Sequence, residues 1–293
     1  MKITIVGSDP SSLALAVMLA RTHTVTVLER DHQRVEQINS GRPPLPDPYA
    51  QAYLYAHRQL LHIKATPDAQ QALRDAALTI VGEAQTAPQS IPRTERLQAN
   101  TAQAHQVLGD ALPLNPGAWF VLQGLVPLGL TTTLRKEHLT PNVIRAPYMG
   151  GPAATLESGL YPRRIVVGAC TGLAHVYAQL MRNQLKDPDA PILLTGSQEA
   201  EAIGLLREPP LNEPAPGLHQ LVQYAGIHGL ATRDLIDGLD LLDTLPVLDT
   251  PQPQPAPQNT PAAVTEGGAS KPRRPLEPAT FGRQRTRARR LRR

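Results

Sequence analysis

The chain has 293 residues, of which 41% are hydrophobic and 18% are charged, so it is long enough for one large domain or two small ones, each with its own core. This composition excludes collagen, a coiled-coil rod and a wholly disordered chain. The 30 prolines are about twice the average usage of roughly 5%, which predicts that part of the chain is proline-rich and irregular.

The net charge of +4 is distributed unevenly. Residues 251–293 hold nine Arg and one Lys against two Glu, so they carry +8 and leave −4 for residues 1–250. The basic average therefore describes the end of the chain, while the body is acidic. Composition alone thus gives no reason to treat the whole protein as a basic nucleic-acid binder.

A single cysteine, Cys170, excludes a disulfide framework and a multi-cysteine zinc site and is compatible with a reducing compartment. We interpret it as a small packing residue. The nine histidines have no metal-ligand spacing, so we expect no metal site. The first residues resemble no export signal, and the longest apolar run, residues 13–20, is far shorter than a membrane span. We expect a cytoplasmic protein without membrane insertion.

In chain order, short β-branched runs alternate with apolar helical patterns. Strands are predicted at 2–7, 24–29, 60–65, 77–82, 118–124, 142–147, 164–169 and 191–196, and helices at 10–23, 30–41, 67–75, 94–110, 171–185, 197–208 and 218–229. This alternation predicts an α/β fold, a Rossmann-like doubly wound parallel sheet that places ligands at the carboxyl ends of its strands.

Composition then suggests three regions. We interpret residues 1–190 as a Rossmann-like dinucleotide-binding-type domain and 191–245 as a helical segment, interrupted by prolines after residue 208. Residues 246–293 form a proline-rich linker and an arginine-rich tail, both of which we expect to be disordered.

The turn after the first strand carries a degenerate dinucleotide-binding fingerprint. Gly7 keeps the first glycine of G-x-G-x-x-G, but Asp9 replaces the second. Asp followed by Pro is a good N-cap, so the Asp9 carboxylate is expected to take the helix amides that a pyrophosphate would bind, and to weaken phosphate binding by roughly 1–4 kcal/mol. Glu29 ends the second strand, where it is equally compatible with a ribose-binding acid and with a solvated acid opening the next helix.

Five segments, in order, resemble the UDP-glucose/GDP-mannose dehydrogenase family over roughly residues 1–240. They are residues 38–48, 77–87, 125–135, 161–168 and 218–239. Members of that family oxidise a sugar alcohol to a carboxylate with NAD, through a cysteine on a second nucleotide-binding domain. We expect this chain to lack that domain. The resemblance implies a degenerate NAD site of weak affinity, formed by Gly7, Ser8, Asp9, Ser12, Glu29 and Gly82.

The same resemblance places the family's catalytic groups on unsuitable residues. The threonine position falls on Leu125, the two glutamates on Tyr148 and Pro152, the lysine on Gly204 and the asparagine on Glu208. The hydroxyl, the two carboxylates and the cation are absent from these positions, and Glu208 adds a negative charge where an anionic transition state would form. We therefore expect no catalytic residues in this part of the chain.

The sequence favours a non-catalytic pseudoenzyme of this type, acting as a binding or assembly module and linked by resemblance to polysaccharide synthesis. One alternative is an NAD-dependent nucleotide-sugar dehydrogenase of UDP-glucose type, with residual activity or with its second domain supplied by another chain. Another is an electrostatic adaptor that binds nucleic acid or an anionic partner through residues 271–293. The resemblance also implies a homodimer through residues 216–240, where Leu218, Leu221, Val222 and Ala225 form an apolar face.

Overall fold

The computed structural model describes residues 1–45, 48–57, 59–84, 91–150, 155–169, 172–208 and 217–241. These residues belong to one compact unit, Met1–Pro246. Pro152, Cys170 and the expected linker and tail at 246–293 lie outside the described residues.

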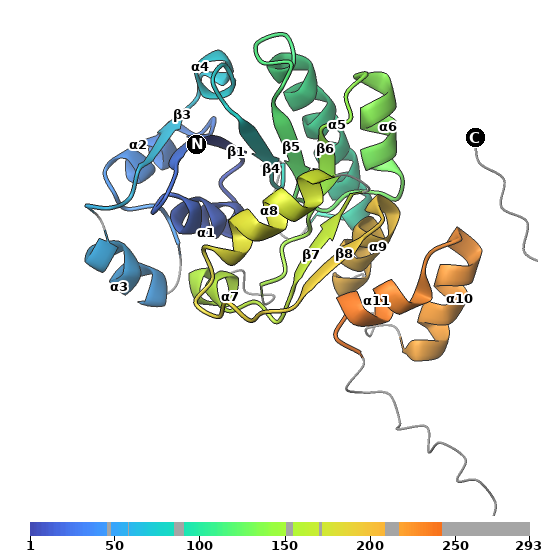
Figure 1. Cartoon of the computed structure of the whole chain (residues 1–293). Helices are drawn as coiled ribbons and strands as arrows, with labels where there is room; N and C mark the ends of the chain where they lie inside the picture. The colour runs from blue at the N-terminus through green and yellow to red at the C-terminus, as the bar shows by residue number, and fades with distance from the viewer. Residues whose placement is uncertain are drawn as a thin grey trace, which may run out of the picture. The chain divides into compact units, whose positions relative to one another are not determined.

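A central sheet organises the unit (Figure 1). Its strands are β1 (Lys2–Val6), β2 (Thr24–Leu28), β3 (Ile63–Thr66), β4 (Leu78–Val81), β5 (Trp119–Leu122), β6 (Val143–Arg145), β7 (Ile165–Gly168) and β8 (Ile192–Thr195). They lie in the order β3-β2-β1-β4-β5-β6-β7-β8, with parallel pairing except between β6 and β7. All eight predicted strands and the Rossmann-like fold class are confirmed.

The strand order creates a switch point beside β1. The chain moves outward from β1 to β2 and β3, then returns to pair β4 with the other side of β1. Connections that leave in opposite directions open a crevice at the carboxyl ends of the two central strands, where doubly wound sheets bind ligands. Gly7 follows β1 and Gly82 follows β4, so both lie at this crevice.

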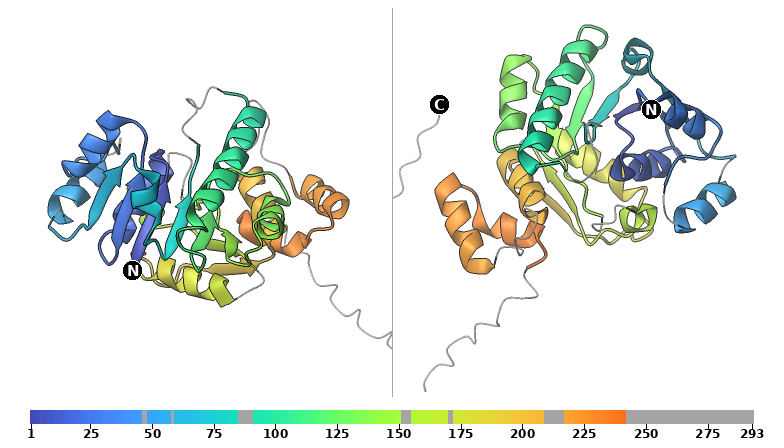
Figure 2. Two further views of the ribbon diagram at one scale, coloured as in Figure 1. Left: turned by 90° about the horizontal axis from the view of Figure 1, so that it is seen from above. Right: turned by 180° about the vertical axis from the view of Figure 1, so that it is seen from behind.

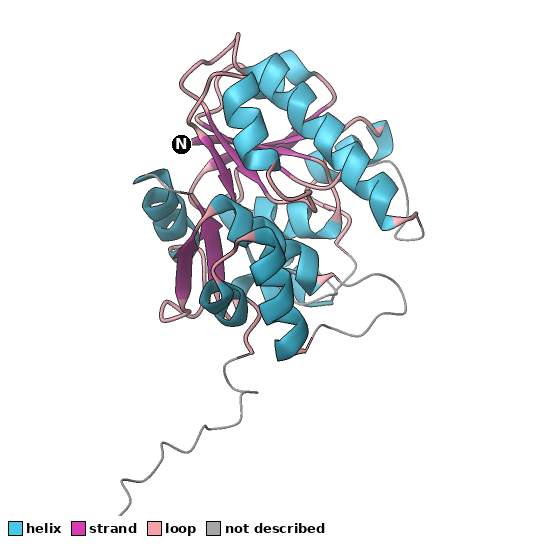
Figure 3. Cartoon of the chain, turned by 90° about the vertical axis from the view of Figure 1, so that its right-hand side faces the viewer, coloured by secondary structure: helices cyan, strands magenta, loops and turns pink. Residues whose placement is uncertain are grey.

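Helices cover both faces of the sheet (Figures 2 and 3). Their bounds are α1 (Pro10–Leu19), α2 (His32–Asn39), α3 (Pro48–His57), α4 (Ala69–Leu73), α5 (Arg93–Ala111), α6 (Leu130–Glu137), α7 (Leu156–Leu160), α8 (Gly172–Arg182), α9 (Ser197–Arg207), α10 (Leu218–His228) and α11 (Thr232–Gly238).

Two hydrophobic clusters correspond to the two faces. Ile5, Ile80 and Ile144 of the sheet pack with α1, α7 and α8, while Phe120 and Leu122 pack with α5 and α6 on the other side. Nearly all of α1 is buried, as expected for a helix that is apolar all round. This helix is therefore held firmly at the edge of the crevice that its N-terminus faces.

The sheet continues past residue 190, where the sequence suggested a domain boundary. The four residues of β8 pair in register with β7, from Ile192 opposite Ile165 to Thr195 opposite Gly168. Helix α9 packs against β6 and β7. Strand pairing therefore does not follow the proposed division, and the segment after residue 190 begins as part of the sheet.

The expected apolar face of α10 needs correction. Leu221 and Ala225 are fully buried in a cluster with Ile203 of α9 and Leu235 of α11, so the chain itself covers half of the predicted face. Leu218 and Val222 remain 39% and 50% exposed. The helix ends at His228 because Gly229 adopts a left-handed conformation with φ +65°, which confirms the predicted stop.

The membrane prediction concerns helices only. In the ranges that the structure describes, no helix combines the length and the apolar character needed to cross a membrane.

The two kinds of position on α10 make a testable contrast. Leu221→Asp buries an unpaired charge and should lower the free energy of unfolding by about 4 kcal/mol or more. Val222→Asp, one residue away on the exposed side, should change the free energy of unfolding of the monomeric chain by less than about 1 kcal/mol. Urea unfolding followed by circular dichroism measures both, and equal losses in the two variants would contradict the assignment of faces.

Candidate functional site

The turn that leads from β1 into α1 shapes the crevice. Gly7 has φ +105° and donates its amide to Leu28 O at 3.1 Å. A Cβ at Gly7 would lie 2.9 Å from the backbone oxygen of Glu83, so both the conformation and the space require glycine. This turn brings Asp9 to the N-terminus of α1.

Asp9 caps α1, as predicted. Its Oδ1 accepts the backbone N–H groups of Ser11 at 3.0 Å and Ser12 at 3.1 Å, and also the Ser11 hydroxyl. Its Oδ2 accepts the Ser12 hydroxyl and, across the crevice, the amide of Glu83 at 3.3 Å. The carboxylate therefore holds donors of the helix N-terminus that would otherwise face a phosphate group.

Gly82 and Ser12 fit together closely at the same point. A Cβ at Gly82 would lie 2.0 Å from the Ser12 hydroxyl oxygen and 3.0 Å from Asp9 Oδ2. Gly82 is thus needed because the Asp9 and Ser12 side chains occupy the space beside it.

Glu29 is buried, with 1% of its surface exposed, so its interpretation as a solvated acid is wrong. Its carboxylate accepts the Ser8 hydroxyl and the amide of Asp31 at 2.7 Å. Asp31, and not Glu29, is the N-cap of α2. Arg34 of α2 donates to the Ser8 hydroxyl at 2.8 Å and to Ser8 O at 3.0 Å. The structure thus brings Ser8 and Glu29 together, but engages both within the protein.

Glu83, which the sequence does not single out, links the ends of β4 and β5 beside the crevice. It accepts the Leu125 amide at 2.6 Å through Oε1, and the side chains of Asn100 at 3.0 Å and Arg96 at 3.3 Å through Oε2. Asn100 also donates to Leu125 O at 2.7 Å. The backbone of Leu125, the residue at the family's threonine position, is held on both sides by this network.

The other positions mapped from the family make contacts within the protein. The Leu125 side chain is buried. Tyr148 donates its hydroxyl to Thr155 O at 3.0 Å. Glu208 is half-exposed and pairs with Arg96 at 3.0 Å. Pro152 lies outside the described residues. None of these arrangements brings an acid, a base and a nucleophile together.

Gly204 lies against a buried cation that the sequence analysis missed. A Cβ at Gly204 would lie 2.4 Å from Arg145 Nη2 and 3.4 Å from Pro147 Cβ. Arg145 is 1% exposed and donates Nη1 to Leu122 O at 2.7 Å. Its Nε has no hydrogen-bond partner among the described residues. A guanidinium from β6 therefore fills the space where a side chain from α9 would begin.

Burial lowers the pKa of Arg145 to about 10, while the negative charges of Glu201, Glu83 and Glu208 oppose that shift. The guanidinium therefore stays charged at neutral pH. A buried cation is costly unless nearby charges compensate it. Here three carboxylates at longer range supply that compensation: one follows β4, one lies on α9 and one directly follows α9.

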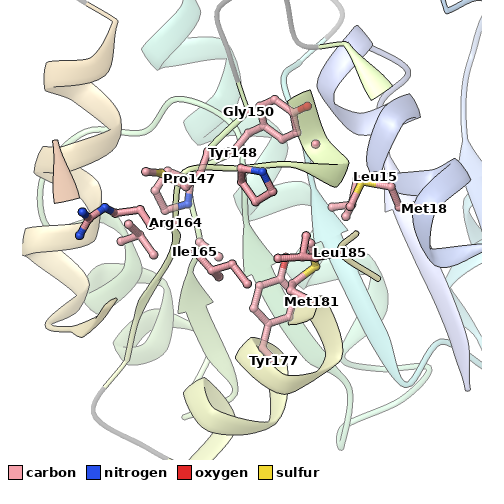
Figure 4. Close-up of a pocket in the computed structure, with 15 residues that line it drawn as sticks. Leu15, Met18, Pro147, Tyr148, Gly150, Arg164, Ile165, Tyr177, Met181 and Leu185 are labelled. Atoms are coloured by element: carbon pink, nitrogen blue, oxygen red, sulfur yellow. The ribbon is translucent and has the colours of Figure 1, made fainter. Parts of the chain in front are cut away.

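Tyr148 lines a small apolar cavity together with Tyr177, Met18 and Met181 (Figure 4). Its volume is about 40 Å³, an order of magnitude below the roughly 300–1,000 Å³ of ligand pockets. Burial raises the pKa of the Tyr177 phenol, so this hydroxyl stays protonated near neutral pH. We regard the cavity as a packing void beside α1 and α8.

The residues at the crevice do not fit a tightly held NAD. The second glycine, which would admit the pyrophosphate, is Asp9, and this carboxylate already takes the donors of α1. Both carboxylate oxygens of Glu29 already accept a hydrogen bond, from Ser8 and from Asp31. For metals, no group of three or more His, Cys, Asp or Glu side chains able to hold an ion occurs among the described residues.

Comparison with known proteins supports the resemblance. The chain is 27% identical to the UDP-glucose 6-dehydrogenase of Streptococcus pneumoniae over 81% of its length, and 25% identical to that of Campylobacter jejuni over 82%. It spans 60% of the length of each of these curated relatives. No protein-family model matches. The two curated matches confirm the similarity to nucleotide-sugar dehydrogenases over 60% of the length of those relatives.

Solved structures agree on the fold. The GDP-mannose dehydrogenase of Pseudomonas aeruginosa has a TM-score of 0.59 at 17% identity and covers 84% of this chain, which in turn covers 60% of that chain. The UDP-D-ManNAc dehydrogenase of Pyrococcus horikoshii has a TM-score of 0.56 at 19% identity, with 85% of this chain and 59% of that chain covered.

Asp9 provides the first test of the site. Asp9→Gly removes a negative charge and a Cβ from the path of a pyrophosphate and frees the amides of Ser11 and Ser12, so NAD affinity should rise roughly tenfold, equivalent to about 1.4 kcal/mol. Isothermal titration with NAD measures it. Asp31→Gly, which removes the N-cap of α2, is the matched control and should leave NAD affinity unchanged. A folded Asp9→Gly protein with parental affinity would contradict the prediction.

Arg145 and Gly204 provide the second test. Gly204→Ala should destabilise the chain by about 2 kcal/mol or more, because the new methyl displaces a buried guanidinium from its bond to Leu122. In an Arg145→Met background the same change should cost little, which gives a coupling of at least about 1 kcal/mol. Gly226→Ala is the control, since a Cβ there meets nothing within 4 Å. Additive effects in chemical denaturation would argue against the contact.

Proposed function

We propose that this chain is a nucleotide-sugar-dehydrogenase-like pseudoenzyme, a non-catalytic binding or assembly module. The observation that carries the proposal is the set of side chains at three mapped catalytic positions. Leu125 is buried and apolar, Tyr148 donates its hydroxyl to a backbone oxygen, and Gly204 lies against Arg145. The proposal rests on these residues and not on the length of the chain.

Each of these positions lacks the chemical group that the resemblance assigns to it. Leu125 offers no hydroxyl to orient a water, and Tyr148 offers no carboxylate to accept a proton. Arg145 is a cation close to Gly204, but its side chain is buried, so an oxyanion in the crevice would not reach it. We accordingly propose that any NAD binding is weak and does not lead to turnover.

The alternative activity is that of the relatives themselves, which are UDP-glucose 6-dehydrogenases. A second nucleotide-binding domain would add a cysteine but would not replace the groups missing at Leu125, Tyr148 and Gly204. For this reason we place the non-catalytic function first.

The activity test uses the full chain. We expect NADH formation at background level with UDP-glucose, GDP-mannose and UDP-N-acetylmannosamine, because Tyr148 and Pro152 leave no carboxylate base at the two mapped glutamate positions. The Streptococcus pneumoniae enzyme serves as the positive control in the same buffer, and binding of NAD, NADH, UDP-glucose and UDP is titrated in parallel. NADH above background would favour the dehydrogenase and refute the pseudoenzyme.

We further propose that a second copy of the chain covers the exposed side of α10. Leu218 and Val222 lie one turn apart and are both partly exposed, a pattern that suits a helix packed against its symmetry mate. Val222→Asp should convert a dimer to a monomer in analytical ultracentrifugation, whereas Val176→Asp, an exposed valine on α8, should not. A parent protein that sediments as a monomer at micromolar concentration would exclude the dimer.

A further inference from the structure

Asp9 does more than cap a helix, because its two carboxylate oxygens have different partners. Oδ1 accepts only donors of its own helix turn, from Ser11 and Ser12. Oδ2 accepts the Ser12 hydroxyl and the amide of Glu83, which follows β4. Capping therefore uses one oxygen, and the other connects the end of β1 to the end of β4.

Glu83 makes the next connection in the same direction. Its backbone donates to Asp9, while its side chain accepts from the Leu125 amide beyond β5 and from Asn100 of α5. The Asn100 side chain also accepts the amide of Ala84, the residue after Glu83, at 2.7 Å. Three segments distant in sequence are thus linked by two neighbouring carboxylates.

The packing around these carboxylates leaves little free space. A Cβ at Gly124 would lie 2.6 Å from Gly82 O, so the ends of β4 and β5 are in direct backbone contact. Gln123 donates to the Ser11 hydroxyl at 3.2 Å, which joins the end of β5 to α1 as well.

We propose that Asp9 and Glu83 form an internal carboxylate joint, which binds the ends of β1, β4 and β5 together in the place where related folds hold a dinucleotide. The backbone N–H groups of Ser12, Glu83 and Leu125 need acceptors in the folded state. In this chain the acceptors are its own carboxylates. The crevice is therefore stable without a ligand, whatever the catalytic status of the protein.

The Asp9→Asn variant distinguishes the proposed joint from simple capping of α1. Asn is as good an N-cap as Asp, so a residue that only caps α1 would tolerate the change. In the joint, the amide NH₂ of Asn would face the amide of Glu83, and one donor would lose its acceptor. We expect the melting temperature to fall by about 4 °C or more, and amide hydrogen exchange at Glu83 to accelerate roughly tenfold or more.

Two further variants complete the experiment. Asp31→Asn is the matched control, because Asp31 accepts Gln33 N at the start of α2 and lies away from the joint, so the melting temperature should move by less than about 1 °C. Glu83→Gln tests the second carboxylate and should accelerate exchange at Leu125 specifically, with exposed Glu95→Gln as its control.

The joint is overturned if Asp9→Asn and Glu83→Gln melt like their controls and leave exchange at Glu83 and Leu125 unchanged. No ligand and no turnover enter these measurements, so their failure leaves the proposed function untouched. Conversely, the detection of dehydrogenase activity would not affect the joint.

Discussion

Backbone N–H groups converge where α1 begins and where β4 and β5 end. The acceptor that pairs with them decides whether the protein itself fills this crevice or leaves it open to a ligand. In a doubly wound sheet the helices that follow the carboxyl ends of the strands direct their N-terminal N–H groups toward one crevice. Here Asp9 and Glu83 accept these donors. The glycine at 82 follows from that choice, because the Asp9 and Ser12 side chains occupy the space beside it.

The central strands were predictable because each is a short β-branched or apolar run buried on both faces. Helices α3, α6 and α7 were not predicted. Helix α6 contains three consecutive threonines and begins at Leu130 after the N-cap Gly129, which has no side chain to cap it, so neither its propensity nor its start indicates a helix. Helix α7 has only five residues. Tertiary packing, which the local sequence does not encode, fixes these elements.

The site was predictable where its contacts are local. The N-cap role of Asp9 involves residues two and three positions away, so the sequence reveals it. Burial of Glu29 depends on Ser8, and the role of Glu83 depends on Leu125 and Asn100, partners that only the fold brings near. Motif positions indicated that catalytic groups were absent, but not that Arg145 fills the space beside Gly204.

The contact between Arg145 and Gly204 also constrains the order in which this sequence can change. With arginine at 145, a Cβ at 204 would lie 2.4 Å from Nη2 of the guanidinium, so any larger residue there requires the arginine side chain to move. Replacing the arginine alone would leave the charges of Glu201, Glu83 and Glu208 without this buried cation. Residues 145 and 204 are therefore expected to change together rather than one at a time.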